Sequence, residues 1–140
     1  MTDYRSLINK IPYAQYHGIF CQEAVSGIQF ILQADERFIG NPMIRAFHGG
    51  VINGLLGCSM RLTTMHAQNL EYPPELISIT TTFLRSAKIE NDLFSSAKIN
   101  RTGRRVVSVS ADVWQRRDSE ELILVAQATA SLKILENKSA

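Results

Sequence analysis

The chain has 140 residues and a formal net charge of +2, with 45% hydrophobic and 20% charged residues. This size fits one domain, and this balance is typical of folded globular proteins, which excludes a largely disordered chain. No stretch reaches the roughly 18 to 20 apolar residues of a membrane-spanning helix. The weak positive charge does not favour nucleic acid as the main ligand.

The N-terminal sequence and the cysteines indicate the cellular compartment of the chain and the state of its thiols. The first residues lack the apolar core of a secretory signal, so we expect a cytoplasmic protein with a single domain over residues 1–140. Cys21 and Cys58 lie far apart without a Cys-x-x-Cys pattern. We therefore expect two buried thiols, no disulfide framework and no metal site.

The first third of the chain predicts a short helix followed by a β-hairpin. Apolar residues at helical spacing predict the helix over residues 2–11, within an N-terminal segment of about residues 1–14, and Pro12 ends it. Two strand-like runs between residues 17 and 34 predict the hairpin, with its turn at Ser26-Gly27.

Residues 50–67 predict a buried helix, because the first three turns are apolar or small on every face. Gly54 and Gly57 each cost about 1 kcal/mol of helix stability relative to Ala. Such a cost favours the close approach of another backbone, so we expect a sheet wrapped against this helix. The preceding residues 35–47 predict an irregular loop that breaks at Gly40-Asn41-Pro42.

The rest of the chain predicts long antiparallel strands and a short tail over residues 136–140. The strand-like segments are 75–87, 92–102, 104–117 and 122–135. One long helix against such a sheet is an α+β architecture. Since one sheet leaves edges and a face uncovered, we expect two copies to pair edge to edge or back to back.

The segment Phe47-His48-Gly49-Gly50-Val51 opens the buried helix. A helix N-terminus presents unpaired N–H groups and the positive end of the helix dipole, and glycines leave those amides accessible. Such a site suits a carbonyl oxygen that gains negative charge during a reaction. The purely structural alternative is that His48 caps the helix and the glycines fit a tight turn.

Three later motifs join His-Gly-Gly in a fixed order, namely T-x-F-L-R-x-A at residues 81–87, G-R-R-V-V-x-V-x-A-x-V-x-Q at 103–115 and A-x-A-T-A at 126–130. Over roughly residues 15–135 the chain resembles hotdog-fold thioesterases of the phenylacetate-degradation (PaaI-like) type. The resemblance implies a long central helix wrapped by a curved antiparallel sheet. It also implies an acyl-CoA thioesterase that acts as a homodimer or homotetramer, with coenzyme A as part of the substrate and no other cofactor.

The resemblance also implies site residues at the interface of the dimer. The Gly50 amide would polarise the thioester carbonyl, His48 would line the same place, and Asn41 is the nearest match to a polar residue that holds water or the acyl group. Guanidinium groups suit the phosphates of coenzyme A. Arg85, Arg104 and Arg105 are the candidates, and solvated strand ends are the alternative interpretation of these three arginines.

One position departs from the family pattern. Members of this type carry a carboxylate nine residues after the histidine, and here that residue is Gly57. No Asp or Glu occurs between Asn41 and Asn69, yet hydrolysis needs a group that accepts a proton from water or attacks carbon. We rank His48 with Asn53 first as replacements. The other candidates are Cys58, His17, His66, Asp35 and Glu36.

The missing carboxylate leaves a second function open. The chain would then bind acyl-CoA with little or no turnover, or would need a homologous subunit that retains the carboxylate.

Overall fold

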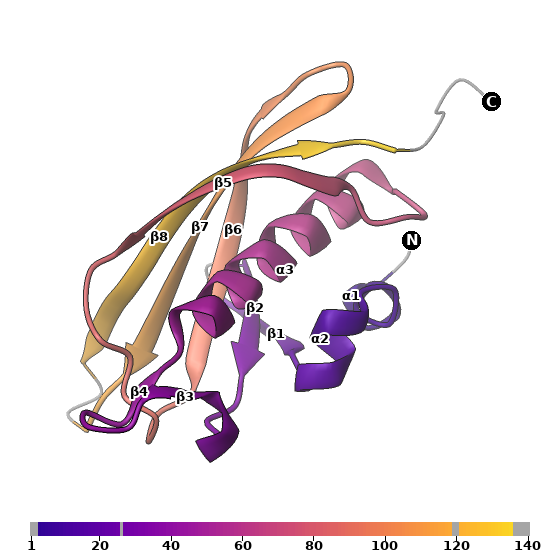
Figure 1. Ribbon diagram of the computed structural model, residues 1–140. Coiled ribbons are helices and arrows are strands. Elements are labelled where there is room, and N and C mark those ends of the chain that lie inside the picture. The colour runs from indigo at the N-terminus through magenta and orange to yellow at the C-terminus, as the bar shows by residue number, and fades with distance from the viewer. Residues whose placement is uncertain (1–2, 26, 119–120, 136–140) are drawn as a thin grey trace.

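A computed structural model describes residues 3–25, 27–118 and 121–135 (Figure 1). Its helices and strands follow one another as α1 (Tyr4–Ile8), α2 (Pro12–His17), β1 (Phe20–Ala24), β2 (Gly27–Leu32), the 3-10 helix η1 (Glu36–Phe38), β3 (Ile39–Asn41), β4 (Ala46–Phe47), α3 (Gly49–Gln68), β5 (Glu75–Phe83), β6 (Leu93–Thr102), β7 (Val106–Arg116) and β8 (Leu122–Lys133).

The long helix α3 lies inside the curve of the sheet, as the sequence predicted (Figure 1). Leu55, Leu56 and Met60 on α3 have no exposed surface. The helix ends at Asn69, which takes the left-handed conformation with φ 52°. The predicted buried helix is confirmed, and its apolar side chains form the centre of the core.

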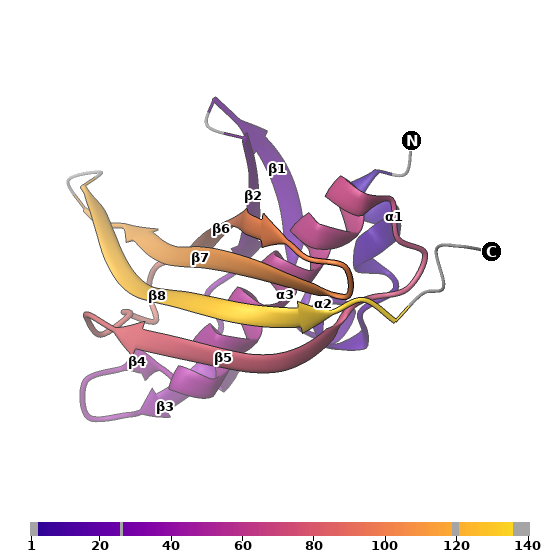
Figure 2. The same cartoon turned by 90° about the horizontal axis from the view of Figure 1, so that it is seen from above.

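The six long strands form one antiparallel sheet in the order β1-β2-β6-β7-β8-β5. In β7, Val107, Val109 and Val113 are fully buried, and they alternate with half-buried side chains on the other face. Figure 2 shows β5 along one margin of the sheet, beside β8. The α+β fold with a helix wrapped by a curved sheet is confirmed, and β5 is an edge strand.

The N-terminal segment differs from the single helix predicted over residues 2–11, because α1 and α2 are two separate helices. The side chain of Asp3 caps α1 by accepting a hydrogen bond from the Ser6 amide at 2.9 Å. Ile11 is extended, and Pro12 then begins α2. Proline suits a first helical position because its φ is fixed and its missing N–H is not needed there. The Ser26 turn residue and the expected tail 136–140 lie outside the described residues.

The predicted irregular loop over residues 35–47 is more ordered than expected. It contains η1 and the two-stranded ladder of β3 and β4. The Phe47 amide donates to the Ala87 carbonyl at 2.9 Å, and the His48 amide donates to the Phe38 carbonyl at 2.8 Å. Strands of three and two residues are too short to show a period in the sequence, so pattern analysis could not find them.

Over the residues that the structure describes, none of the helices combines the length and apolar character needed to cross a membrane.

Candidate functional site

His48 caps the N-terminus of α3. Its Nδ1 accepts a hydrogen bond from the Gly50 amide at 2.8 Å, and its carbonyl accepts from the amides of Val51 and Ile52 at 3.0 and 3.2 Å. Within residues 3–25, 27–118 and 121–135, no hydrogen bond uses the Gly49 N–H. The Gly49 amide is therefore the donor that this helix end leaves unpaired.

The bond between His48 and Gly50 limits what both residues can do in this conformation. The Gly50 amide, predicted to polarise a carbonyl, already has an acceptor. Because Nδ1 accepts, the proton of the neutral imidazole is on Nε2, which then cannot accept another proton. For His48 to act as a base and for Gly50 to bind an oxyanion, the ring must turn away from the helix.

The backbone of β3 and the ring of Phe83 enclose the start of α3. A Cβ on Gly40 would lie 2.6 Å from the His48 Cα, so only glycine permits this approach of β3. A Cβ on Gly49 would lie 3.5 Å from the Phe83 ring, and Phe83 itself is 51% exposed. The helix N-terminus is therefore bordered by an aromatic side chain that comes from the edge strand β5.

Asn53 lies one turn further along α3 and is hydrogen-bonded to β5. The Thr81 hydroxyl donates to the Asn53 Oδ1. Among the described residues, no hydrogen bond uses the Asn53 amide nitrogen, which stays available as a donor. The structure thus joins the predicted Asn53 to Thr81, for which the sequence predicted only a place in a strand.

Open space lies beside Gly57, where the family carboxylate would stand. A Cβ placed on Gly57 would meet no atom within 4 Å. A Cβ at this position would therefore displace no neighbour. Gly54, one turn earlier, differs, because a Cβ there would collide with the side chain of Tyr13.

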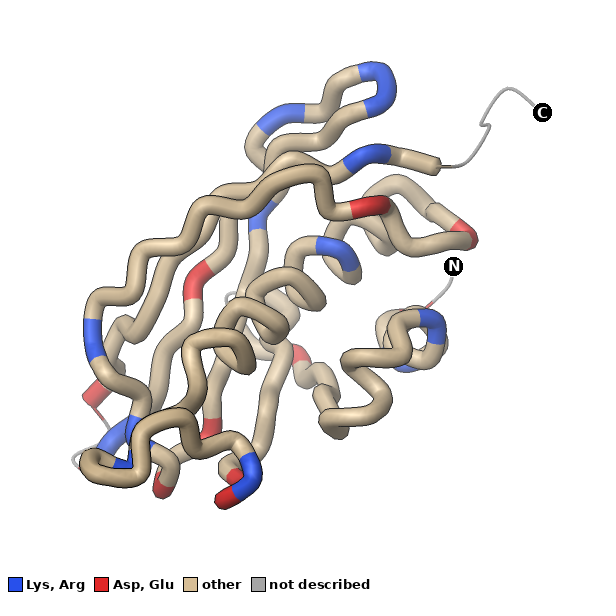
Figure 3. Tube along the Cα trace, viewed as in Figure 1, with Lys and Arg blue, Asp and Glu red and all other residues tan. Residues whose placement is uncertain are grey.

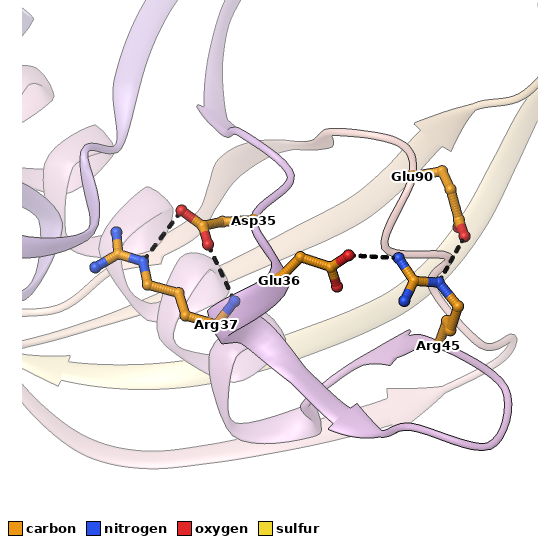
Figure 4. Close-up of polar contacts among 5 residues, drawn as sticks. All are labelled: Asp35, Glu36, Arg37, Arg45 and Glu90. Atoms are coloured by element: carbon orange, nitrogen blue, oxygen red, sulfur yellow. Dashed lines mark hydrogen bonds and ion pairs between the residues drawn. The ribbon is translucent and has the colours of Figure 1, made fainter.

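Ion pairs hold the segment that leads into His48 (Figure 4). Arg45 donates to Glu36 at 2.7 Å and to Glu90 at 3.2 Å. Asp35 accepts from the Arg37 amide at 3.0 Å and pairs with its guanidinium at 3.4 Å. Asp35 and Glu36, two candidates for the missing carboxylate, are therefore each engaged by an arginine.

Asn41 lies at the end of β3 and organises its own loop. Its Oδ1 accepts a hydrogen bond from the Met43 amide at 3.1 Å, and the residue is exposed. The predicted role of Asn41 in holding water or an acyl group stays a prediction.

The three predicted arginines lie at two ends of the molecule. Arg85 follows β5 at the end where Phe83 borders the α3 N-terminus, and its guanidinium donates to the Leu124 carbonyl at 3.3 Å. Arg104 and Arg105 lie in the β6–β7 hairpin, one of the blue segments of Figure 3. The opposite end of α3 reaches this hairpin.

Gln68 at that end of α3 donates to Thr102 at 3.4 Å. The 20 residues of α3 span about 30 Å. One chain therefore does not bring Arg104 and Arg105 to the N-terminus of α3.

The remaining nucleophile and base candidates have distinct environments. Cys58 is 3% exposed, and burial raises the pKa of its thiol to about 12, so it stays protonated and is a poor nucleophile. His66 lies near the C-terminal end of α3 and stacks on Tyr4 with ring centroids 4.3 Å apart. His17 ends α2 and packs edge-on against Tyr13 and Phe38.

Comparison with known proteins assigns the family. Residues 39–132 match the family model of the acyl-CoA thioesterase N-terminal domain, and the chain therefore belongs to this family. The predicted relation to hotdog thioesterases is confirmed. No protein of curated function matches the chain in sequence.

Several solved structures share the fold at low sequence identity. A phenylacetic acid degradation-related protein from Ralstonia eutropha JMP134, described as a putative thioesterase, superposes with a TM-score of 0.75 at 20% identity, covering 95% of this chain and 100% of that one. The Escherichia coli PaaI protein of the phenylacetic acid degradation operon gives 0.73 at 15%, covering 92% of each chain. Zebrafish thioesterase superfamily member 2 gives 0.72 at 18%, covering 94% and 92%.

Four residues of the site were not predicted from the sequence as functional residues. Gly49 belongs to the motif, but the capping bond that leaves its amide unpaired depends on the orientation of the His48 ring. Thr81 and Phe83 share the alternating face of β5, a signal that marks them as facing the helix. For Tyr13 no sequence signal exists, since its position depends on how α2 packs on α3.

Proposed function

We propose that the protein hydrolyses acyl-CoA thioesters at the N-terminus of α3. The observation that carries the proposal is the unpaired Gly49 amide at the positive end of a 20-residue helix, in a chain of the acyl-CoA thioesterase family. A carbonyl oxygen that becomes negatively charged gains stabilisation from such donors in the transition state. Coenzyme A enters as part of the substrate, and the proposal includes no further cofactor.

The proposed reaction depends on a turn of the His48 ring. Turning the ring releases the Gly50 amide as a second oxyanion donor and frees Nδ1 to accept a proton. Water, held by the Asn53 amide, forms a bond to the carbonyl carbon while its proton passes to His48. The C–S bond then breaks, and the coenzyme A thiolate leaves and takes up that proton.

A second copy of the chain completes the proposed site. The nine-residue strand β5 is paired on one side only, and Ile77 on it is 53% exposed. Antiparallel pairing of two β5 strands about a two-fold axis would place the β6–β7 end of one copy beside the α3 N-terminus of the other. Arg104 and Arg105 of the partner could then contact the phosphates of a substrate bound here.

The test of hydrolysis measures thiol release from a panel of short, medium and aromatic acyl-CoAs. We expect wild-type turnover, with a loss of tenfold or more in kcat/KM for His48→Ala and for Asn53→Ala. His66→Ala, near the other end of α3, serves as the matched control and should keep wild-type activity. Robust wild-type turnover that survives both alanine changes would overturn the assignment of His48 and Asn53.

The alternative function, acyl-CoA binding with little or no turnover, rests on Gly57. A Cβ at this position meets no atom within 4 Å, so Gly57→Glu tests whether only the base is missing. A weak wild type that gains strongly from this substitution, or from mixing with a homologous subunit, would favour the binding function. If neither wild type nor Gly57→Glu hydrolyses any member of the panel, the proposed activity is wrong.

A further inference from the structure

Tyr13 crosses the glycine face of α3. An ideal Cβ on Gly54 would lie well under 3.0 Å from the Tyr13 hydroxyl and from the ring carbon that bears it, closer than real Cβ contacts allow. Only a glycine at position 54 lets the phenol lie directly on the helix backbone. Gly54 is therefore needed for the close approach of the Tyr13 side chain from α2, and not, as the sequence predicted, for the close approach of a strand.

The ring of Tyr13 has a defined position, and its hydroxyl stays available. His17, one turn later on α2, packs edge-on against the ring with centroids 4.4 Å apart and an interplanar angle of 72°. The side chain is 36% exposed, and the hydrogen bonds of the described residues do not include its hydroxyl. A tyrosine hydroxyl can donate one hydrogen bond and accept others, so this one is available to water or to a ligand.

The hydroxyl borders the space left by the missing carboxylate. Successive helical residues are rotated by 100°, so Gly57 projects between the directions of Asn53 and Gly54, one turn further along. The open space at Gly57 therefore lies between the helix directions of Asn53 and Gly54, and the Tyr13 hydroxyl lies over Gly54. Burial raises the pKa of Tyr13, so the phenol stays uncharged at neutral pH and its oxygen can accept a hydrogen bond.

We propose that Tyr13 is a catalytic residue that hydrogen-bonds the attacking water from the side opposite Asn53. The inference rests on the proposed hydrolysis and adds a second contact to the water. In the reaction, the water accepts a hydrogen bond from the Asn53 amide, donates one O–H to the Tyr13 oxygen and gives its other proton to His48, so that its second lone pair forms the new C–O bond. Tyr13 keeps its own proton. The contacts with Asn53 and Tyr13 would hold the water beside Gly57, which has no side chain that could hold it.

Tyr13→Phe tests the hydroxyl alone, because the ring and its packing on His17 remain. We expect kcat to fall about tenfold, which corresponds to one hydrogen bond made to the transition state, while KM changes less than twofold. Tyr16→Phe is the matched control, since Tyr16 lies on the same helix and is 74% exposed. Its kcat should equal that of wild type, and the thermal midpoints of both variants should stay within about 2 °C of wild type.

Gly54→Ala tests the position of the phenol independently, because the new Cβ must displace the Tyr13 side chain. We expect a similar fall in kcat, and little further fall when Gly54→Ala is added to Tyr13→Phe. All kinetics are measured in the wild-type and in the Gly57→Glu background.

The outcomes separate this inference from the proposed function. If the parent proteins hydrolyse acyl-CoA and Tyr13→Phe keeps kcat within twofold, the role of Tyr13 is wrong and hydrolysis stands. A rise in KM at constant kcat would also overturn the role, since it would assign Tyr13 to substrate binding. If neither parent hydrolyses any acyl-CoA, both proposals are overturned together.

Discussion

The hydrogen bond between the His48 ring and the Gly50 amide decides which amide at the helix start is unpaired. Both residues stand in a motif that the sequence displays, but the motif alone does not reveal the rotamer of the histidine. With Nδ1 on Gly50, the unpaired amide is Gly49. The sequence predicts Gly50 as the available donor, whereas the orientation of the His48 side chain leaves the neighbouring Gly49 amide unpaired.

Burial determines the chemistry of the thiol at residue 58. Because a pKa of about 12 keeps Cys58 protonated, we predict that iodoacetamide at pH 8 leaves it unmodified in the folded protein. Cys21, which is more accessible, should react faster, and both should react in denaturant. Mass spectrometry of digested samples provides the measurement, and rapid native alkylation of Cys58 would contradict the assigned burial.

His17 should make stability depend on pH. Burial, and then the charge of Arg37, lower the pKa of His17 in the folded state. As pH falls through about 6.5, the unfolded chain takes up a proton that the folded chain does not, so the free energy of unfolding decreases. This contribution is absent above that pH and levels off once pH passes below the folded-state pKa.

The substitution His17→Phe keeps an aromatic ring between Tyr13 and Phe38 and removes the titrating group. We predict a smaller loss of stability between pH 7 and pH 5 than in wild type, measured by urea unfolding at a series of pH values. Equal losses in the two proteins would show that His17 does not contribute to the pH dependence.

At the scale of elements, a buried glutamine on β7 holds the loop that supports β4. Gln115 has no exposed surface, accepts from the Lys88 amide at 3.0 Å and donates to the carbonyls of Lys88 and Asn91 at 2.7 and 3.1 Å. The same loop pairs with β4, since the Ala87 carbonyl accepts from the Phe47 amide. Gln115 on β7 thus holds the loop that pairs with β4, the strand that directly precedes α3.

Gln115→Leu should therefore destabilise the protein by about 2 to 3 kcal/mol, because it leaves backbone groups of a tight loop without partners. Urea unfolding gives the change, and hydrogen exchange should show a faster Phe47 amide. Gln127→Leu is the matched control on the exposed face of β8, where the side chain bonds Asp112 at 3.1 Å. It should cost less than about 0.5 kcal/mol, and equal effects would refute the role of Gln115.

Elements also differ in how far the sequence predicts them. The 20-residue α3 and the long strands were predicted because burial imposes periods of 3.6 and 2 on many consecutive residues. The split between α1 and α2 and the ladder of β3 and β4 were not. Those segments are too short to show a hydrophobic period, and one or two local hydrogen bonds decide their conformation.

At the scale of the whole molecule, β5 should form the interface between two copies. An exposed lysine on the edge strand would oppose pairing through charge and the cost of its desolvation. We therefore predict that Ile77→Lys shifts the protein toward the monomer and lowers acyl-CoA turnover in parallel. Analytical ultracentrifugation over a concentration series measures the first effect, and thiol release measures the second.

Val25→Lys is the control for this substitution, because Val25 is exposed on the β1–β2 hairpin at the other margin of the sheet. It should leave the assembly unchanged. A wild-type chain that is monomeric and still active would contradict a site shared between two copies, since Arg104 and Arg105 could then not reach the substrate.

The sequence by itself determined the buried helix, the alternating strands, the glycine-rich helix start and the absence of a carboxylate at position 57. Each of these is a property of neighbouring residues or of a short period, so it can be detected before the chain is folded. Only the tertiary structure decided that His48 occupies the Gly50 amide, that Tyr13 lies on Gly54, and that the predicted arginines stand at opposite ends of the domain. Those facts depend on rotamers and on contacts between distant segments, where packing rather than local propensity selects the arrangement.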